Sequence, residues 1–410
     1  MDTQPFAMQQ PGHDAVASAL RERLVDQLRM SGVLNEQNIE QALRKVPRHI
    51  FLPGVSLKQA YADIAVPTRW EDETPVSSAS QPSMVAIMLE QLQLSTGMRV
   101  LEIGAGTGYN AALMAELTGS IGRVITLDID PEIVREAQQH LAAAGYRNVE
   151  VIAADGSSGY APGAPYDRII LTVGASNISP AWVDQLTDGG LLVIPLWLGG
   201  PEASVAFRKH EEKLESESLA PCGFMRLRGS GATAEEWASL PDGRFIFAEH
   251  AQELAPEVHA LLHSRPRRRL YLRPDSGLLQ RLGLRGCTLV AIYPANRSPR
   301  AQQTSRKSRG HWGVFARDEE GPSLALFATL LPMLLVFGGP AAENQIKRVL
   351  MYEASQPALP LERWKITAFR RDSAPEPSPG IVRVQRDQFT IDVRMYASQP
   401  RDAEWQATVE

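Results

Sequence analysis

Cysteine is scarce in this chain, which has only Cys222 and Cys287 among its 410 residues. Two cysteines cannot form a multi-bridge disulfide framework or a zinc site, and so low a number predicts a cytoplasmic protein. Long apolar runs are also missing, because the most apolar stretch, Leu324 to Gly339, is too short for a membrane span and contains Pro332. The N-terminus lacks the apolar core of a signal peptide. We therefore expect no membrane association and interpret residues 324–339 as buried structure of a globular domain.

No single sign of charge dominates the chain, whose net charge is −5. Residues 1–200 carry 13 basic and 22 acidic side chains, and residues 201–410 carry 29 and 25, so the halves have charges of −9 and +4. The acidic first half would repel a phosphate backbone, so we expect no nucleic-acid partner. Basic clusters at Arg267–Arg269 and in the loop Ala295 to Arg309 could attract an acidic peptide, although basic loops are mostly solvated.

Glycine is concentrated in one informative place, the stretch from Val100 to Tyr109, which reads Val-Leu-Glu-Ile-Gly-Ala-Gly-Thr-Gly-Tyr. Its first residues predict a buried strand, its three alternating glycines a turn, and the apolar spacing from Tyr109 to Leu117 a helix. Glycine lets the backbone pass close to a ligand, and the helix behind the turn points unpaired N–H groups toward it. An ordinary strand-to-helix turn is the alternative interpretation.

From Met98 to about Leu198 strands and helices alternate in a pattern typical of a doubly wound α/β sheet. The expected strands are Val100–Ile103, Val124–Asp128, Val149–Ala153, Tyr166–Thr172 and Gly190–Pro195. Ligands of such sheets bind at the carboxyl ends of the strands, near the point where strand order reverses. We therefore expect Gly104, Asp128, Asp155 and Thr172, which stand at strand ends, to converge on one site.

The strictly alternating glycines and the acidic strand ends resemble those of class I S-adenosylmethionine-dependent methyltransferases, which have a Rossmann-like fold. This resemblance implies S-adenosyl-L-methionine as the methyl donor, S-adenosyl-L-homocysteine as the product, and no metal. It also implies a cofactor site built from Glu102, Gly104, Ala105, Gly106, Thr107 and Gly108 at the methionine side, Asp128 and Ile129 at the ribose, Asp155 and Gly156 at the adenine, and Thr172.

A closer resemblance is to the protein-L-isoaspartate O-methyltransferases, over roughly residues 15–225. It is carried by Val46–Pro53, Ala60–Asp63, Ser78–Pro82, Leu101–Tyr109 and the pair Asp155-Gly156. Carried over by position, Ser80 matches the active-site serine of this family, and Ser78 stands where Thr is usual. The resemblance further implies that Ser80, Gln81, Val173 and Gly174 contact the substrate. A serine-rich segment before a helix could otherwise be only a loop and a helix cap.

Two features depart from the usual pattern of the family. The Pro-Ile-Gly-x-Gly-Gln segment before the serine element is absent, and the stretch from Asp63 to Ser80 is longer than usual, which puts a broad isoaspartyl-peptide specificity in doubt. The long form, with Ser-Ser-Ala-Ser-Gln-Pro and Cys-Gly-Phe before an extra domain, resembles a bacterial subgroup found beside ribosomally made, later modified peptides such as lanthipeptides, graspetides and FxLD peptides.

We expect four segments along the chain. Residues 1–14 form a disordered tail, 15–228 the catalytic domain, 229–242 a linker, and 243–410 an α+β accessory domain that could recruit the substrate. No repeat or catalytic motif is visible in the last segment. The oligomeric state stays open.

The expected activity is methyl esterification of an aspartyl or isoaspartyl carboxylate in a peptide or protein. A carboxylate is ionised at neutral pH, so Ser80 and Ser78 would position it and no strong base is needed. The ester can then cyclise to a succinimide (aspartimide). A dedicated ribosomal precursor peptide is the favoured substrate, and general isoaspartyl repair is the alternative. A small-molecule or nucleic-acid methyltransferase, or an inactive cofactor-binding module, is less favoured.

Overall fold

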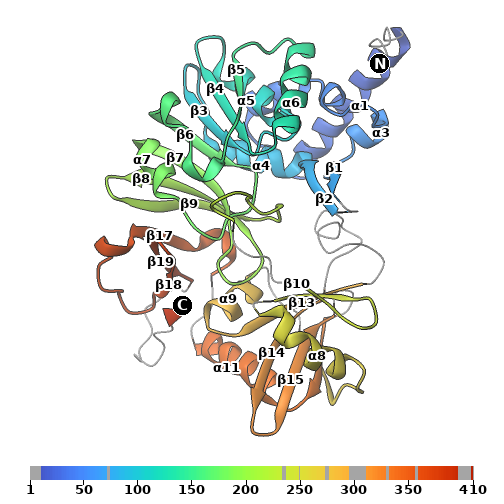
Figure 1. Ribbon diagram of the computed structural model, residues 1–410, viewed down its shortest axis with the longest axis vertical. Helices are drawn as coiled ribbons and strands as arrows, with labels where there is room; N and C mark the ends of the chain where they lie inside the picture. Colours follow the sequence, from blue (N-terminus) through green and yellow to red (C-terminus); the bar gives the residue numbers. More distant parts are fainter. Residues whose placement is uncertain are drawn as a thin grey trace.

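The computed structural model describes residues 11–71, 74–232, 237–248, 250–272, 277–294, 311–328, 332–355, 359–395 and 408–409. Figure 1 shows an upper part that carries the N-terminal helices and a large sheet, and a lower part built on a second sheet. None of the described helices has the length and apolar character needed to cross a membrane. The basic loop Ala295 to Arg309 lies outside the described residues.

The upper part is a mixed sheet with the strand order β20-β18-β19-β17-β9-β8-β7-β6-β3-β4-β5. Its central strands are parallel from β7 to β5, and β8 and β9 pair antiparallel beyond them. These strands are β3 (Arg99–Ile103), β4 (Arg123–Asp128), β5 (Val149–Ala153), β6 (Tyr166–Leu171), β7 (Leu186–Leu196), β8 (Ala203–His210) and β9 (Lys213–Pro221). Strand order reverses at β3, which lies between β4 and β6, and the glycine-rich turn follows this strand.

This arrangement confirms the expected doubly wound fold, because all five predicted parallel strands form. The connecting helices are α5 (Tyr109–Thr118), α6 (Pro131–Ala143) and α7 (Pro180–Gln185). Asp130 begins α6 by accepting a hydrogen bond from the Glu132 N–H, and Pro131 at the first helical position has no N–H to satisfy. The parallel strands are covered on both faces, which is why they read as continuous apolar runs.

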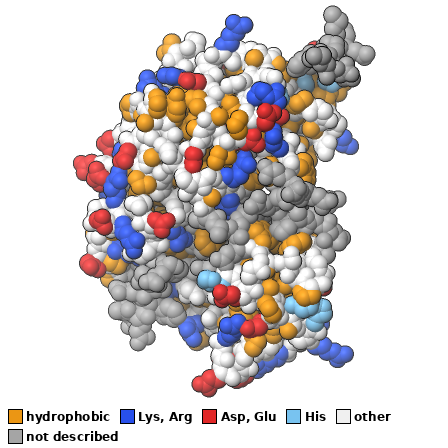
Figure 2. Space-filling view, in the orientation of Figure 1, with side chains coloured by type: hydrophobic (Ala, Val, Ile, Leu, Met, Phe, Trp, Pro, Cys, Tyr) orange, Lys and Arg blue, Asp and Glu red, His pale blue; other side chains and the backbone are white. Residues whose placement is uncertain are grey.

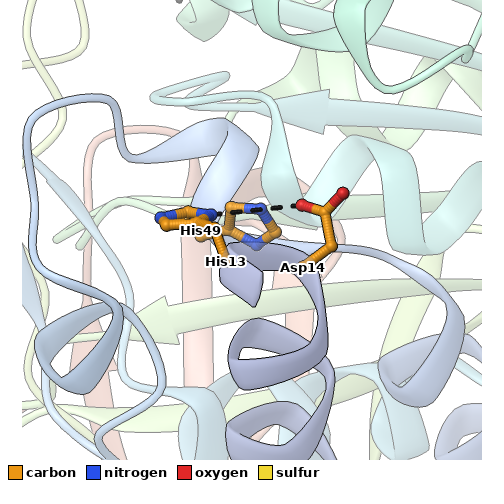
Figure 3. A group of neighbouring side chains, drawn as sticks. All are labelled: His13, Asp14 and His49. Carbon is orange, nitrogen blue, oxygen red and sulfur yellow. Dashed lines mark ion pairs between the residues drawn. The ribbon is translucent and has the colours of Figure 1, made fainter. Parts of the chain in front are cut away.

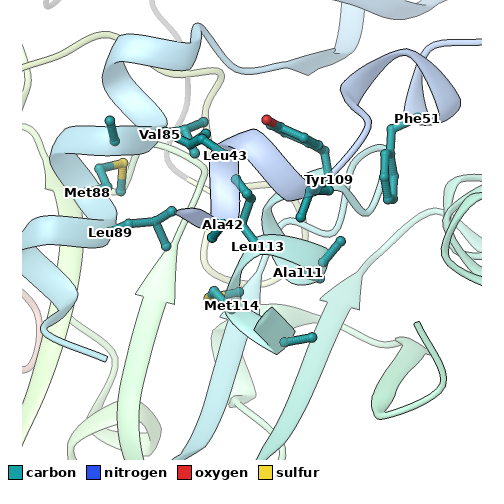
Figure 4. Close-up of a cluster of buried hydrophobic side chains, with 14 of the residues drawn as sticks. Ala42, Leu43, Phe51, Val85, Met88, Leu89, Tyr109, Ala111, Leu113 and Met114 are labelled. Atoms are coloured by element: carbon teal, nitrogen blue, oxygen red, sulfur yellow. The ribbon is translucent and has the colours of Figure 1, made fainter. Parts of the chain in front are cut away.

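The N-terminal helices pack on the helices that cover one face of this sheet. They are α1 (Pro11–Met30), α2 (Gln37–Lys45), the 3₁₀ turn η1 (Arg48–Phe51) and α3 (Leu57–Ala60). Figure 4 shows Leu43 of α2 and Phe51 of η1 packed beside Tyr109 and Met114 of α5. The expected disordered tail of residues 1–14 does not include residues 11–14, because α1 already begins at Pro11, and residues 1–10 lie outside the described part of the chain.

The serine-rich segment is a strand rather than the loop that its composition suggests. It forms β2 (Thr74–Ala79), which pairs antiparallel with β1 (Val66–Glu71) in a separate two-stranded hairpin. Arg69 of β1 lies 3.3 Å from the Asp130 carboxylate, so an ion pair attaches the hairpin to the start of α6. The helix after it is α4 (Pro82–Leu92), as predicted.

The lower part is a seven-stranded antiparallel sheet with the order β10-β11-β13-β14-β15-β16-β12. Its strands are β10 (Trp237–Ser239), β11 (Phe245–Ala248), β12 (Arg268–Tyr271), β13 (Thr288–Tyr293), β14 (His311–Asp318), β15 (Gly321–Phe327) and β16 (Met333–Gly338). Among the described residues, the helices that pack on it are α8 (Ala251–Leu262), α9 (Leu278–Leu284) and α11 (Ala341–Ser355). The described residues of the apolar run 324–339 belong mainly to β15 and β16, and most of them are buried, as expected.

The last described strands differ from the expected accessory domain of residues 243–410. They are β17 (Lys365–Arg370), β18 (Val382–Gln385), β19 (Phe389–Arg394) and β20 (Thr408–Val409). β17 pairs with β9, so these strands extend the catalytic sheet, as Figure 1 shows. The side chains of Trp364 and Phe389 are fully buried in the same core as Phe207 of β8, and this shared burial explains the pairing.

The expected linker of residues 229–242 also carries structure. Trp237 to Ser239 form β10 of the second sheet. Gly229 lies against the carboxylate of Asp155, and the Ser230 N–H donates to that carboxylate at 2.7 Å. The chain therefore leaves the catalytic part along the rim of the predicted cofactor site.

Candidate active site

The glycine-rich turn is held at the carboxyl ends of the central strands. The N–H groups of Gly104 and Ala105 both donate to the Leu127 carbonyl of β4 at 2.8 Å. Gly104 has a φ of +104°, and a Cβ on it would lie 2.6 Å from Thr172 Oγ1 and 3.1 Å from Val173 Cγ1. No other residue fits there, because both the backbone conformation and the close approach exclude a side chain.

Asp128 stands at the end of β4 beside this turn. One carboxylate oxygen accepts from the Gly106 N–H at 3.2 Å and the other from the Asp130 N–H at 3.2 Å. Burial raises the pKa of Asp128 above its usual value, although these two hydrogen bonds act to lower it. Arg228 lies 3.7 Å from the same carboxylate and favours its charged form. Asp128 is thus placed as a ribose-binding carboxylate would be.

Glu102 of β3 is completely buried beneath the turn. Its carboxylate accepts hydrogen bonds from Asn110 at 2.8 Å and from the Thr126 hydroxyl at 2.7 Å. Burial raises the pKa of Glu102 to about 7, although both hydrogen bonds favour the charged form. The charge of this residue therefore changes near neutral pH.

The serine segment lies over the glycine turn. A Cβ on Gly106 would be 3.7 Å from the Ser78 carbonyl oxygen, so β2 and the turn face each other across a short gap. Arg48, which is 1% exposed, donates through Nη2 to the Ser80 carbonyl at 3.0 Å and through Nε to the Ala60 carbonyl at 2.9 Å. Arg48 thus fixes the backbone at Ser80.

A second anchor holds the other side of the same segment. Asp63 accepts from the Gln81 side-chain amide and from the Ser83 N–H, both at 2.9 Å. The carboxylate therefore satisfies an N–H of the first turn of α4, as a cap does. Ser80 is held between Arg48 and Asp63, with its own side chain half-buried at the cavity wall.

One cavity of about 1180 Å³ joins these features. Most of the predicted site residues line it, from β2, the glycine turn and the ends of β3, β4 and β6. They are Ser78, Ser80, Gln81, Glu102, Gly104, Ala105, Gly106, Thr107, Asp128, Ile129, Gly156, Thr172 and Val173. Of the four strand-end residues expected to converge, Gly104, Asp128 and Thr172 line this cavity, at the point where the strand order reverses, and Asp155 does not.

Three predicted residues do not reach the cavity wall. Gly108 packs against helix α6, where a Cβ would lie 3.2 Å from Leu141. The backbone of Gly174 pairs with the segment after β9, its N–H donating to the Met225 carbonyl at 2.8 Å. Asp155 begins the turn η2 (Gly156–Ser158) and accepts hydrogen bonds from the Ser157 N–H and hydroxyl and from the Ser230 N–H.

These bonds change the chemistry of Asp155. Burial opposes its ionisation, but the hydrogen bonds from Ser157 and Ser230 outweigh burial and lower its pKa to about 2. Asp155 is therefore a turn cap here, and Gly156 alone of the predicted adenine pair lines the cavity.

Sequence reasoning missed several residues of the wall. Arg226 lies 2.8 Å from Glu202, and the Glu202 carboxylate also accepts from the Phe224 N–H at 2.7 Å. The guanidinium carbon of Arg226 lies over the Trp197 ring, 5.8 Å from the centre of the ring. The Cys-Gly-Phe element was the available signal, because it precedes this stretch directly.

His49 lies outside the cavity wall. Its Nδ1 lies 2.8 Å from the Tyr61 hydroxyl, and burial together with the neighbouring His13 lowers its pKa. Figure 3 shows His13 and Asp14 of α1 beside His49. The three side chains can approach a common ion, but none of them lines the cavity.

The residues present fit S-adenosylmethionine. The glycine turn leaves a cradle that Cβ atoms would fill, and a carboxylate stands at the end of the next strand. The fold and this site define a class I S-adenosylmethionine-dependent methyltransferase with a Rossmann-like sheet.

The comparisons narrow this class. Residues 19–231 match the model of the protein-L-isoaspartate(D-aspartate) O-methyltransferase family. Protein-L-isoaspartate O-methyltransferase 2 of Archaeoglobus fulgidus is 44% identical over 209 residues, covering 51% of this chain and 93% of the relative. The corresponding protein of Ignicoccus hospitalis is 41% identical over 209 residues, covering 50% and 96%. The chain belongs to the protein-L-isoaspartate(D-aspartate) O-methyltransferase family, and it is an S-adenosylmethionine-dependent carboxyl O-methyltransferase.

A solved structure extends the likeness beyond this region. A protein-L-isoaspartate O-methyltransferase superposes with a TM-score of 0.51 at 25% identity, covering 85% of this chain and 96% of that one. Residues 19–231 could not supply so large a share, so the alignment includes part of the chain after residue 231. Both comparisons agree with the class that the site defines.

Proposed function

We propose that this protein transfers a methyl group from S-adenosylmethionine to an isoaspartyl carboxylate on a peptide or protein substrate. The observation that carries the proposal is the position of Ser80, whose backbone is anchored by Arg48 at the wall of the cavity that holds the glycine turn. The two relatives described above are named for this activity, and the match covers 93% and 96% of their lengths.

Each part of the wall has a separate task in this proposal. The cofactor supplies a methyl group on a positively charged sulfonium sulfur. The neutral thioether that forms when the methyl group is transferred is a good leaving group. Gly104 and Gly106 admit its methionine end, and Asp128 accepts hydrogen bonds from the ribose. The Ser80 hydroxyl donates a hydrogen bond to the substrate carboxylate and turns one oxygen toward the methyl carbon. The substrate is ionised at neutral pH, so positioning replaces a general base.

The ester product can react further without the enzyme. The backbone nitrogen that follows the esterified residue attacks the ester carbonyl, its proton is lost, and methanol leaves. A succinimide (aspartimide) ring results. Hydrolysis of this ring gives aspartate or isoaspartate, which is the chemistry of isoaspartyl repair.

A dedicated precursor peptide is a second candidate substrate. Two observations favour it: β1–β2 occupies the long segment before Ser80, and residues of the second sheet close one side of the cavity. Extra side chains around the cavity would select among peptides. On the face shown in Figure 2, Lys and Arg side chains are mixed with Asp and Glu side chains, so an acidic peptide would have to be guided by local contacts.

The test is methyl transfer followed by mass spectrometry, with an isoaspartyl hexapeptide and its aspartyl counterpart as substrates. Ser80→Ala should lower kcat for the isoaspartyl peptide about ten- to a hundredfold, because it removes one hydrogen bond to a charged group. Affinity for S-adenosylhomocysteine should stay unchanged. Ser83→Ala, three residues along in α4 and away from the cavity wall, is the matched control.

The possible outcomes separate the candidates. Transfer to unrelated isoaspartyl peptides supports general repair, and transfer to a precursor encoded beside the gene alone supports a dedicated substrate. Cofactor binding without transfer to either would leave an inactive binding module and overturn the proposal. Equal activity of wild type and Ser80→Ala would remove Ser80 from the mechanism.

A further inference from the structure

The cavity has a second wall that the methyl-transfer chemistry does not use. Phe247, Tyr293, Trp312 and Phe327, from four strands of the lower sheet, line the same cavity as Ser80 and the glycine turn. At about 1180 Å³ the cavity exceeds the roughly 300–1,000 Å³ of ordinary ligand sites. It therefore has room for more than one ligand.

Three side chains of this wall region form what we call the aromatic row: Trp237, Phe247 and Trp312. Ring centres of Trp237 and Phe247 are 4.9 Å apart, and those of Phe247 and Trp312 are 6.4 Å apart. The register places Phe247 and Trp312 on either side of Ala291, which is fully buried, and the two rings meet edge to face. All three aromatic side chains are half-buried.

The aromatic row is not part of the core of the second sheet. The opposite face of the sheet packs on α8 through Ile246 and Ile292. On the face that carries the row, α9 and α11 cover Val314 and Val336. They do not cover Phe247 and Trp312, which line the cavity instead. A large aromatic side chain buries 150–250 Å² when it is covered, so rings left half-open beside a cavity are suited to binding.

The row is held at a fixed distance from the catalytic part by close backbone contact. A Cβ on Gly283 of α9 would lie 1.7 Å from the Gly199 carbonyl oxygen of the β7–β8 loop. A Cβ on Gly200 would lie 2.9 Å from the Cα of Gln280 in the same helix. Leu284 at the end of α9 is buried in the core of the catalytic sheet. Such contact leaves little freedom for the second sheet to swing away.

We propose that the aromatic row is a subsite for a large apolar or aromatic side chain of the methyl-accepting peptide, next to the residue that is esterified. This inference rests on the proposed function. The occupant is the substrate itself, because Phe247 and Trp312 of the row line the same cavity as Ser80, so a peptide that extends from Ser80 along this cavity reaches them. The subsite selects peptides by the neighbour of the reacting residue, so it sets specificity without taking part in the chemistry.

The test uses full-length protein and isoaspartyl hexapeptides that differ only in one flanking residue, Phe, Leu, Lys or Gly, placed on either side in turn. Wild type should favour Phe over Gly about ten- to a hundredfold in kcat/KM at one of the two positions, as expected for burial of one aromatic side chain. Trp312→Ala and Phe247→Ala should each remove most of this preference through KM and leave turnover of the Gly peptide unchanged. Trp312→Phe should restore most of it.

Tyr271→Ala is the matched control, because Tyr271 is an aromatic residue of the same sheet, 81% exposed on β12 and away from the cavity. Binding of the Phe and Gly peptides in the presence of S-adenosylhomocysteine, measured by calorimetry, gives a readout independent of transfer. If no peptide is methylated but the Phe peptide binds through Trp312, the proposed function fails and the subsite stands. The subsite would be overturned if wild type bound and methylated the Phe and Gly peptides equally well. It would also be overturned if the variants lost the same factor in kcat/KM on both peptides.

Discussion

Glu102 offers a test of how burial controls stability in this fold. Its carboxylate is fully buried, with a pKa raised from 4.5 to about 7 by desolvation. Glu102→Gln keeps the size of the side chain and removes the charge. The new amide can still accept from Asn110, and the Thr126 hydroxyl, which now donates to Glu102, can turn and accept from the amide N–H.

The magnitude follows from the difference between the folded and unfolded pKa. Below pH 4.5 the carboxyl is protonated in both states and costs nothing. Between pH 4.5 and 7 only the unfolded chain releases its proton, so folding loses about 1.4 kcal/mol per pH unit, and the loss levels off above pH 7 at about 3 kcal/mol. Glutamine pays no such cost. The variant should therefore gain about 2–3 kcal/mol relative to wild type between pH 5 and pH 8.

The assay is urea unfolding of both proteins without cofactor at several pH values. Changes in hydrogen bonding are independent of pH and shift the variant by a constant, so only the slope is diagnostic. Glu150→Gln on β5 is the control, because its exposed ion pair with Arg123 contributes at most about 1 kcal/mol. A difference between Glu102→Gln and wild type that stays flat from pH 5 to pH 8 would refute the reasoning.

Two further substitutions test the site geometry. Gly104→Ala places a Cβ 2.6 Å from Thr172 Oγ1 at a φ of +104°, so it should cost about 2–4 kcal/mol and abolish cofactor binding. Gly32→Ala is the control, because Gly32 has a φ of +71° but open space around it, so this variant should cost only the backbone strain. An equal loss of stability in the melting curves of the two variants would contradict the clash at Gly104. Arg48→Met leaves the buried Ala60 carbonyl and the partly buried Ser80 carbonyl without this donor, which should cost roughly 2–5 kcal/mol. It should lower kcat more than cofactor affinity because it releases Ser80. Calorimetry of cofactor binding beside kinetics checks this, and a matching loss of affinity would count against a positioning role.

The local pattern of the chain was enough to identify the catalytic sheet. Apolar runs of strand length ending in Gly104, Asp128 and Thr172 predicted both the strands and their convergence. This works because parallel strands in a doubly wound sheet are buried on both faces and carry their functional residues at one edge. Ser80 was assigned to the active site only through resemblance, since a serine before a helix has no local signal that separates a cap from an active-site residue.

Long-range packing decided the rest. Nothing in the sequence of β17–β19 tells that these strands pair with β9 rather than with the second sheet, because strand periodicity specifies a buried face and not a partner. For the same reason the sequence did not predict the hairpin that contains Ser78. It also did not predict the hydrogen bonds that Ser157 and Ser230 donate to Asp155. The chain itself determined the glycine cradle and the strand ends through local backbone chemistry. The tertiary structure alone placed an aromatic row opposite them, because only folding brings residues more than a hundred positions apart to one cavity.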